Sequence, residues 1–590
     1  MRTIVLMIAL VVLAALLQSG FARSASALSK RTITSESRAI RNPSEVRHYV
    51  GSEVCAVCHT EVYKDYEATD MGRSMSIVTP QLAKVMNVPA RLSDKVTDRE
   101  FDVYWKNGKL YESESSRNSL GHVRFRTVHQ LRWIIGAGAN GYGAIVERDH
   151  YLFMAPLGFY TRAKVWAPSP GYQDIDLAFS RPVLEGCLFC HSGRARPVAG
   201  TNGEYEDPPF RQLAIGCETC HGPGSAHVAL MTSGMGMRGG GLEIVNPDQL
   251  NPALSNQICE ACHEIGGVRV LQEGKSYLDI LPGKPLNDYL AIFMTPPKRD
   301  SPPPPDQLQQ YYEMIMSKCY RASGGRLRCT TCHDPHVQIP AKEAPAYFNE
   351  RCLTCHTIDS CKLPMMKRLT GRVPDNCIAC HMPRRRVGFI EHAALTNHRI
   401  IAYAGEPMPD TAFDEAGKRS TLVDLDPPPG KEGISQSLIT LLKAYGDLAV
   451  QNPRYNAQYL KVLQQASIRQ PKNALVQAAW GREDLKAGEF GKASLHLELS
   501  LKLDPMSAVV YEDLSIAMEG LGRSDEALVN QQLAVEHDPY NPILQKRLIV
   551  LYIHQKQFVR AKAAMKQYVK AFPQDLFMRR MLALADEQPN

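Results

Sequence analysis

Beyond its N-terminus, the sequence lacks any apolar run long enough to span a membrane, which needs about 20 residues. Arg2 is followed by an apolar run over residues 4–17, and small residues then end in A-S-A at residues 25–27. A basic start, a short apolar segment and an A-x-A site are typical of a secretory signal peptide. We therefore expect residues 1–27 to be cleaved, leaving a periplasmic or otherwise extracytoplasmic protein without a transmembrane anchor. An uncleaved membrane anchor is the alternative.

Cysteine is absent from residues 381–590, although the chain contains 16 cysteines, all between Cys55 and Cys380. A single hydrophobic core rarely grows beyond about 250–300 residues, so this length predicts at least two domains. A proline-rich stretch over residues 404–433 is typical of an inter-domain linker. We therefore expect a cysteine-containing domain over residues 28–403, a linker over 404–433 and a second domain over 434–590.

The cysteine-free domain has small residues and prolines at a regular spacing. They recur every 34 residues, a period typical of tetratricopeptide repeats. Small residues let paired helices approach closely, and proline ends the second helix of each pair. We predict an α-solenoid that either presents a groove to a partner protein or stiffens the neighbouring domain. The positions that share this period are Pro471, Pro505, Pro539, Pro573, Ala493, Ala527, Ala561, Gly488 and Gly522.

The cysteine-containing domain carries seven C-x-x-C-H motifs. This spacing is the attachment signature of c-type haem, in which two thiols add to the haem vinyl groups and the histidine becomes the proximal iron ligand. We therefore predict seven covalently bound haem c groups. The predicted attachment cysteines are Cys55, Cys58, Cys187, Cys190, Cys217, Cys220, Cys259, Cys262, Cys329, Cys332, Cys352, Cys355, Cys377 and Cys380. The predicted proximal ligands are His59, His191, His221, His263, His333, His356 and His381.

Other uses of paired cysteines fit this pattern less well. Zinc ribbons need a second cysteine pair for each metal and no histidine at the next position. Thioredoxin-like pairs would not recur seven times, iron–sulfur clusters use other spacings, and a disulfide framework has no need of histidine. Covalent haem is therefore the interpretation that the spacing favours, and export agrees with it because c-type cytochromes mature outside the cytoplasm.

The sequence has little net charge, with a formal value of +7 over 590 residues. The two propionates of each haem would offset this charge. Arg384-Arg385-Arg386 is a local basic cluster, which we expect to pair with propionates or to lie in solvent. The charge therefore indicates no nucleic-acid partner.

The segment between the first two motifs has a different residue pattern from the rest of the domain. Residues 101–105 and 110–112 alternate as strands do, and a Lys-Asn-Gly-Lys turn over residues 106–109 separates them. We predict a small β-rich insertion over residues 95–165 in a domain that is otherwise helical and rich in loops.

The second axial ligand decides what each iron can do, because a distal histidine or methionine closes the site and an open position permits substrate binding. Enough histidines remain outside the motifs for seven bis-histidine irons, although the sequence does not require this arrangement. These histidines of the cysteine-containing domain are His48, His122, His129, His150, His227, His336, His392 and His398.

Several segments around the motifs resemble a known family. Residues 217–228 read C-E-T-C-H-G-P-G-S-A-H-V, residues 329–336 read C-T-T-C-H-D-P-H, and residues 377–383 read C-I-A-C-H-M-P. With the terminal repeats, these segments resemble the multihaem cytochromes of the cytochrome c-554/c-prime group that carry tetratricopeptide repeats. The resemblance implies a mainly α fold: a loop-rich multihaem cytochrome domain with a small β-rich insertion, followed by an α-solenoid of tetratricopeptide repeats.

The resemblance also implies particular distal ligands, because histidines that follow the motifs commonly ligate neighbouring haems in this family. Carried over to this sequence, these are His227, His336, His392 and His398. Many relatives have a histidine about a dozen residues after the first motif, where this sequence has Met71. Met71 is therefore a further candidate ligand, with packing against haem as its alternative role.

Two cysteines, Cys319 and Cys361, are left over after haem attachment. Both positions resemble cysteines of the relatives, and an oxidising compartment favours a disulfide between them. Two free buried thiols are the alternative.

The sequence thus favours an electron carrier whose repeat domain docks a redox partner protein. The alternative is a multihaem oxidoreductase that acts on a small nitrogen or sulfur compound at one open haem. No motif has the C-x-x-C-K form found at the catalytic haem of one nitrite-reductase family, which weighs against the enzyme.

Overall fold

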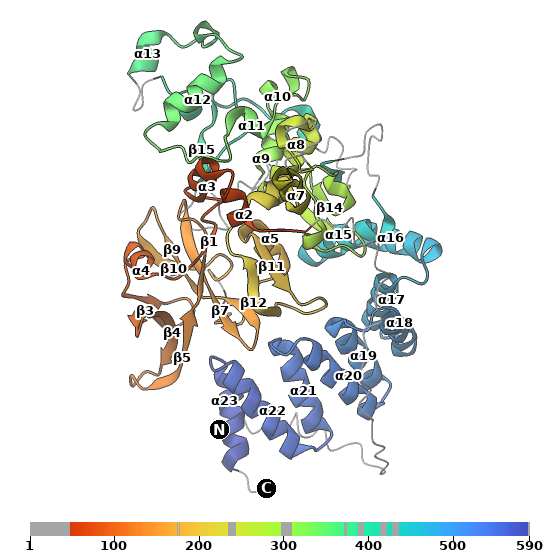
Figure 1. Ribbon diagram of the computed structural model, residues 1–590. Helices are drawn as coiled ribbons and strands as arrows, with labels where there is room; N and C mark the ends of the chain where they lie inside the picture. The colour runs from red at the N-terminus through yellow and green to blue at the C-terminus, as the bar shows by residue number, and fades with distance from the viewer. Residues whose placement is uncertain are drawn as a thin grey trace. The chain divides into compact units, whose positions relative to one another are not determined.

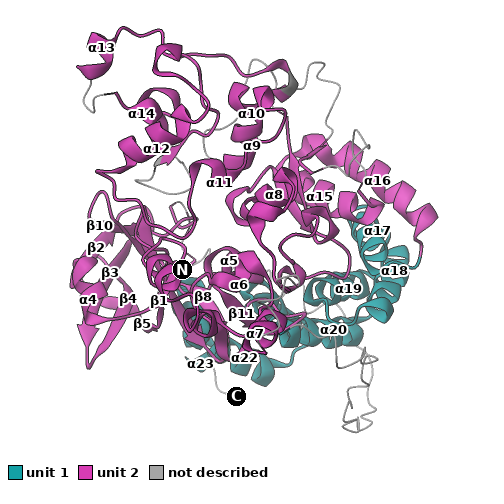
Figure 2. Ribbon diagram, turned by 45° about the horizontal axis from the view of Figure 1, so that its top comes forward, with its two compact units in different colours: residues 1–48, 472–590 teal, residues 49–471 magenta. Residues whose placement is uncertain are grey.

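The computed structural model describes residues 48–173, 175, 177–233, 243–296, 309–370, 375–386, 394–413, 422–426 and 436–587. Figure 1 shows the helices and strands in chain order, and Figure 2 draws two compact units in different colours. We call residues 49–471, in magenta, the first unit, and the helices from residue 472 onward, in teal, the second unit. The predicted signal peptide, residues 1–27, lies outside the described residues.

A four-stranded antiparallel sheet belongs to the first unit. Its strands, in order, are β2 (Ala90–Asp94), β3 (Arg99–Lys106), β4 (Lys109–Arg117) and β5 (Val123–Leu131). Lys106 pairs with Lys109 across the β3–β4 turn, where Asn107 and Gly108 have φ of 49° and 72°. Asn-Gly is the favoured pair for such a turn, because both of its residues must adopt positive φ. The strand, turn and returning strand predicted over residues 101–112 are therefore present.

A six-stranded sheet follows it, with order β1-β6-β7-β9-β10 and β8 paired to β7. Its strands are β1 (Met75–Ile77), β6 (Trp133–Ile135), β7 (Gly141–Arg148), β8 (Tyr151–Met154), β9 (Leu157–Tyr160) and β10 (Val165–Pro168). Trp133 and Ile145 of this sheet share a core with Leu188 of α5 (Glu185–His191). The sheet therefore fixes the helix that carries the second C-x-x-C-H motif.

Three further small sheets lie between and after the motifs, where we had expected only helices and loops. They are β11 (Arg194–Pro197) with β12 (Tyr205–Gln212), β13 (Val268–Leu271) with β14 (Leu290–Met294) and β17 (Val423–Asp424), and β15 (Arg384–Arg386) with β16 (Ala394–Thr396). Strand β17 lies inside the predicted linker, 404–433, so part of that segment belongs to a sheet. The prolines at 427–429 lie outside the described residues.

The motifs lie in or at the ends of helices. These helices are α2 (Ser52–Ala56), α5, α6 (Cys217–His221), α8 (Pro252–His263), α11 (Cys329–Cys332), α12 (Ala344–Leu353) and α14 (Cys377–His381). Other helices of this unit are α3 (Thr60–Glu67), α4 (Pro80–Val85), α7 (Ser225–Thr232), α9 (Gln310–Met316), α10 (Lys318–Ala322) and α13 (Met365–Leu369). Residues that are three and four apart share one face of a helix, so the motifs that lie wholly within α5, α6, α8 and α14 present their two cysteines and their histidine on the same side.

The first unit extends past the expected boundary at residue 434. Helix α15 (Leu438–Gln451) belongs to it because Thr440 Oγ1 donates to Gln272 Oε1 at 2.6 Å and Gln272 Nε2 donates to Gln436 Oε1 at 2.7 Å. Helix α16 (Asn456–Arg469) completes this unit.

The second unit consists of helices that recur every 34 residues. The first helices of the pairs are α17 (Ala474–Lys486), α19 (Ala508–Gly520) and α21 (Pro542–His554), and α23 (Leu576–Glu587) continues the series. The second helices are α18 (Phe490–Leu503), α20 (Ser524–His537) and α22 (Phe558–Ala571). Ala493, Ala527 and Ala561 are 0%, 0% and 3% exposed, as expected for small residues where helices meet. The predicted helical-repeat solenoid is confirmed.

Among the described residues, no helix is both long enough and apolar enough to cross a bilayer.

Candidate functional site

Three histidines of the motifs each face a second histidine from a distant part of the chain. The ring centroids of His59 and His227 lie 6.4 Å apart with an interplanar angle of 21°. Those of His221 and His336 lie 6.1 Å apart at 18°, and those of His333 and His398 lie 6.2 Å apart at 33°. A metal ion lies about 2 Å from an imidazole nitrogen, so two imidazoles on opposite sides of one iron have centroids about 6 Å apart. The spacing therefore fits axial ligation of one iron by each pair.

Hydrogen bonds to backbone carbonyls set the tautomer of three histidines. His221 Nδ1 lies 2.8 Å from the carbonyl of Val245, and His381 Nδ1 lies 2.6 Å from that of Ile401. His398 Nδ1 lies 3.0 Å from the carbonyl of Thr396. Because a carbonyl only accepts, Nδ1 carries the proton in each case, and Nε2 keeps the lone pair that binds a metal.

A carboxylate lies beside the ring nitrogen Nδ1 of His336. Its Nδ1 lies 3.3 Å from Oδ1 of Asp334 in the C-H-D-P-H segment. A carboxylate on Nδ1 orients a ligating imidazole and raises its basicity. Asp334 therefore has the position of an orienting residue for His336.

Burial favours the neutral, metal-binding form of four motif histidines and of His398. It lowers the pKa of His191, His221, His263 and His333, and it lowers the pKa of His398 to about 4. Neutral imidazole is the ligating form, so these side chains need not release a proton at neutral pH.

The structure describes four of the five predicted distal ligands, and three of them lie near a motif histidine. His227, His336 and His398 face His59, His221 and His333. Met71 lies in a turn, and its role as a ligand stays a prediction. His392 lies outside the described residues.

Four motif histidines have no second imidazole opposite them in the described part of the chain, namely His191, His263, His356 and His381. Three of the remaining histidines lie in the β-rich region. His129 packs on Phe179 with centroids 4.4 Å apart, His150 lies 4.0 Å from Glu147, and His122 is exposed in a loop. None of these contacts involves a motif residue.

The cysteines link the motifs to one another. In four places a thiol of one motif lies near enough to a thiol of another to shift its pKa, and the neighbouring Cys55 lowers the pKa of Cys217 to about 6. The paired thiols are Cys55 with Cys217, Cys190 with Cys262, Cys259 with Cys329, and Cys352 with Cys377. Cys220 lies near enough to Cys262 to raise the pKa of that thiol, and Cys355 similarly affects Cys332. The seven motifs therefore form one continuous cluster.

Three of these pairs share a clamp that the sequence analysis missed. A polar side chain three residues before the first cysteine of one motif accepts a hydrogen bond from the backbone N–H of the first cysteine of the other. Cys217 N donates to Ser52 Oγ at 3.0 Å, Cys329 N to Asn256 Oδ1 at 2.9 Å, and Cys377 N to Asn349 Oδ1 at 3.0 Å. The recurrence of a polar residue at this offset was visible in the sequence, but its partner was not.

Glu218, within the third motif, adds a second link to the first. Its carboxylate accepts hydrogen bonds from the backbone N–H groups of Val50 and Gly51, at 2.9 and 2.7 Å, and of Gly224 at 2.7 Å. It is 4% exposed, so these bonds replace the water that a buried carboxylate loses. Glu218 therefore holds the start of the first motif against the third.

Each of the two left-over cysteines lies near a cysteine of the last motifs. Burial raises the pKa of Cys319, and the nearby Cys355 adds to this shift. Cys361 in turn contributes to the raised pKa of Cys377. The disulfide between Cys319 and Cys361 stays a prediction.

The residues present fit the haem c group that the motifs imply. Each motif supplies two thiols and an imidazole, and apolar side chains within some motifs are exposed to water. Val57, inside the first motif, is 80% exposed, and Leu353, inside the sixth, is 46% exposed. Apolar surface of this kind is typical of a site that covers a large apolar group.

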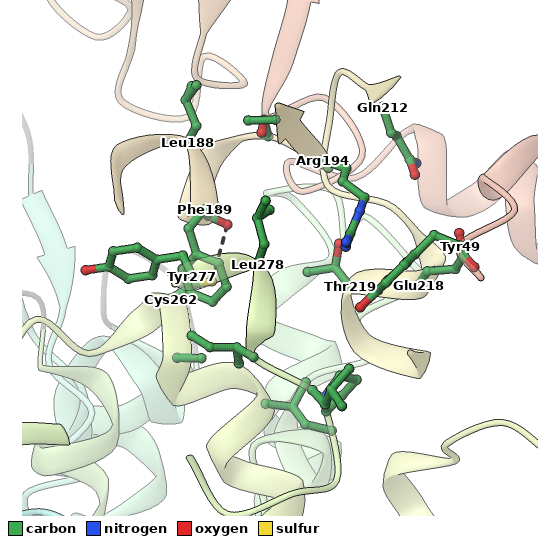
Figure 3. A pocket seen from close by; sticks show the side chains of 18 of the residues that line it. Tyr49, Leu188, Phe189, Arg194, Gln212, Glu218, Thr219, Cys262, Tyr277 and Leu278 are labelled. Carbon is green, nitrogen blue, oxygen red and sulfur yellow. Dashed lines mark hydrogen bonds between the residues drawn. The ribbon is translucent and has the colours of Figure 1, made fainter. Parts of the chain in front are cut away.

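A separate cavity of about 300 Å³ lies among the helices of the second, third and fourth motifs (Figure 3). Leu188, Phe189, Tyr277 and Leu278 give it apolar walls, and Arg194 projects into it beside Tyr49. Cys262 is the motif cysteine on its wall.

Comparison with known proteins gives limited information. No protein-family model matches the chain, and no curated protein matches it. Similar solved structures include a chain of the APC/C hetero-tetramer Cut9–Hcn1, with 15% identity over 25% of this chain and 30% of that chain and a TM-score of 0.23. They also include MamA from Desulfovibrio magneticus RS-1, with 17% identity over 24% of this chain and 77% of that chain and a TM-score of 0.21. A chain of Naa15/Naa10 bound to HypK-THB has 21% identity over 25% and 22% of the two chains and a TM-score of 0.21.

These likenesses concern the helical repeats and leave most of the chain uncovered. This chain spans less than a third of the first of these structures. At such TM-scores they say nothing about what the chain does.

Proposed function

We propose that this chain is an exported heptahaem c-type cytochrome that transfers electrons, and that its helical repeats dock a redox partner protein. The observation that carries the proposal is the set of three histidine pairs, His59/His227, His221/His336 and His333/His398, at 6.1 to 6.4 Å. Each pair joins a motif histidine to one of the predicted distal ligands. Bis-histidine ligation closes both faces of an iron, which suits electron transfer and not substrate binding.

Covalently attached haem would supply one-electron redox chemistry at each motif. The chain's own residues hold the proximal and distal imidazoles, fix their tautomers and set the spacing between motifs. The three clamps and the hydrogen bonds of Glu218 keep neighbouring motifs close, and electron transfer requires such proximity.

Spin-state counting in the purified ferric protein tests the proposal. We expect at least three low-spin bis-histidine irons by electron paramagnetic resonance. Replacing His227, His336 or His398 by alanine should convert one iron each to the high-spin form, because each loses its second axial ligand. The matched controls His122→Ala and His150→Ala should leave the spectrum unchanged. The proposal is refuted if all three ligand variants keep the full low-spin signal.

A multihaem oxidoreductase acting on a small nitrogen or sulfur compound remains the second candidate. It is favoured by the four motif histidines that have no facing imidazole among the described residues. A high-spin ferric signal in the unmodified protein that changes when nitrite or sulfite is added would support it. A wholly low-spin spectrum would exclude it.

A further inference from the structure

The cavity among the second, third and fourth motifs does not have the lining of a haem site. In a C-x-x-C-H helix, the histidine and both cysteines share one face, and the two intervening residues lie on the opposite face. The cavity is lined by such intervening residues, among them Leu188, Phe189 and Thr219. None of His191, His221 and His263 lines it, although an iron would lie about 2 Å from its histidine.

One side of the cavity is apolar. Phe189 and Tyr277 lie with ring centroids 5.1 Å apart, and Leu188 and Leu278 complete this wall in Figure 3. Buried surfaces of this composition bind flat or branched apolar groups through the hydrophobic effect. A volume of about 300 Å³ suits one small molecule.

The other side of the cavity carries an oriented cation. The guanidinium carbon of Arg194 lies 3.6 Å from the ring centroid of Tyr49, so the guanidinium stacks on the ring. Stacking fixes the plane of the group and leaves its N–H edges free to form paired hydrogen bonds with a carboxylate or sulfonate. Lys284 also lines the cavity, and neither Arg194 nor Lys284 has a carboxylate partner in the described part of the chain.

One of the two acidic groups on the wall is already engaged, because Glu218 accepts hydrogen bonds from the backbone N–H groups of Val50, Gly51 and Gly224. Burial raises the pKa of Glu185, whose Oε1 has no hydrogen-bond partner among the described residues. Neither carboxyl forms an ion pair with Arg194 or Lys284 in the described part of the chain, so these cations are open to an incoming anion.

We propose that this cavity binds a small amphipathic organic anion, with its apolar body against Phe189, Tyr277 and Leu278 and its carboxylate or sulfonate on Arg194. Cys262 of the fourth motif lies on the wall of this cavity, whereas His191, His221 and His263 do not. The proposal does not depend on electron transfer.

Calorimetric titration of the full-length holoprotein with 2-naphthoate tests this proposal. We expect one binding site, and we expect Arg194→Gln to raise the dissociation constant about 10- to 100-fold, because a charge-assisted paired hydrogen bond is lost. The control Arg196→Gln lies two residues further along β11, pairs with Glu206 and does not line the cavity. It should leave the dissociation constant unchanged.

Comparison of ligands on the unmodified protein gives a test that needs no variant. The neutral 2-naphthylmethanol lacks the anionic head, and sulfate lacks the apolar body, so both should bind at least about 10-fold more weakly than 2-naphthoate. Absence of 2-naphthoate binding, equal binding of the neutral analogue, or unchanged binding in Arg194→Gln would overturn the proposal. Haem content is measured on the same sample. If the protein carries its full haem content but does not bind 2-naphthoate, the result refutes the anion site and leaves the proposed electron transfer untouched.

Discussion

At the scale of single residues, the imidazole pairs show which contacts could be predicted from the sequence and which could not. The family resemblance singled out His227, His336 and His398 as candidate ligands. The histidines that they meet could not be predicted, since His59 and His227 come together only through folding. Met71 was singled out in the same way, and its role as a ligand stays a prediction.

The hydrogen bonds of Asn256 predict that this side chain holds the fourth and fifth motifs together. Asn256 is 1% exposed and bonds both Leu327 O and Cys329 N, so Asn256→Ala leaves two buried backbone groups without partners. We expect a loss of about 1–3 kcal/mol in stability. We also expect an altered magnetic interaction between the irons of the fourth and fifth motifs.

Asn251→Ala is the matched control for this clamp. Asn251 caps the same helix by accepting a hydrogen bond from Leu254 N, at a distance of 3.0 Å. Its loss should lower the thermal midpoint but leave the magnetic interaction as it was. If both variants change only the midpoint, Asn256 has no role in pairing.

Glu112 predicts a pH dependence of stability. It is 0% exposed, its Oε1 accepts a hydrogen bond from Leu157 N at 3.1 Å, and burial raises its pKa above 4.5. The folded state thus binds this proton more tightly than the unfolded state, so the contribution of Glu112 favours folding at low pH and is lost as the pH rises above 4.5. Glu112→Gln keeps the acceptor without the charge.

We therefore expect Glu112→Gln to raise the melting temperature by about 2–4 °C at pH 7 and to have no effect at pH 4. Scanning calorimetry at both values checks this. Glu100→Gln, which removes an exposed partner of Arg117, serves as the control and should change little at either pH. A melting temperature lowered at pH 7 by Glu112→Gln would contradict the assignment of a neutral buried carboxyl.

At the scale of elements, regular spacing was predictable and irregular pairing was not. The 34-residue period gave the solenoid, because the alanines and prolines occupy the same place in each helix pair. The hairpin over residues 101–112 was predictable from its alternation and its Asn-Gly turn. The sheets β11–β12, β13–β14–β17 and β15–β16 were missed, because strands of two to eight residues without clear alternation pair only in the tertiary structure. The docking of α15 on β13 was missed for the same reason.

The repeats predict opposite effects for two glycine substitutions. A Cβ at Gly481 would lie 2.6 Å from Cγ of Leu497, which is 0% exposed, whereas a Cβ at Gly491 would meet nothing within 4 Å. Gly481→Ala should destabilise the repeats by about 1–3 kcal/mol through overpacking. Gly491→Ala should stabilise them by about 0.5–1 kcal/mol through the lower entropy of the unfolded chain.

Thermal unfolding of the full-length protein, followed by far-ultraviolet circular dichroism, compares the two variants. Equal midpoints for Gly481→Ala and Gly491→Ala would show that α17 and α18 do not pack as closely as the structure indicates.

At the scale of the whole molecule, the two units should depend differently on haem. The unit over residues 49–471 has apolar side chains such as Val57 in water beside its motifs, whereas the repeat unit buries its own core of Ala493, Leu497 and Leu514. Full-length protein made without haem attachment should therefore be cleaved rapidly in its first unit. Limited proteolysis with mass spectrometry should leave a fragment of the repeat unit. Equal resistance of both units would contradict a structural role for haem.

The account as a whole depends on thioether bonds between porphyrin and the seven cysteine pairs. The most direct measurement is the intact mass, under denaturing conditions, of protein purified from its native host. The account predicts a mass about 4 kDa above that of the processed polypeptide, corresponding to seven haem groups. A mass equal to that of the polypeptide alone would contradict it.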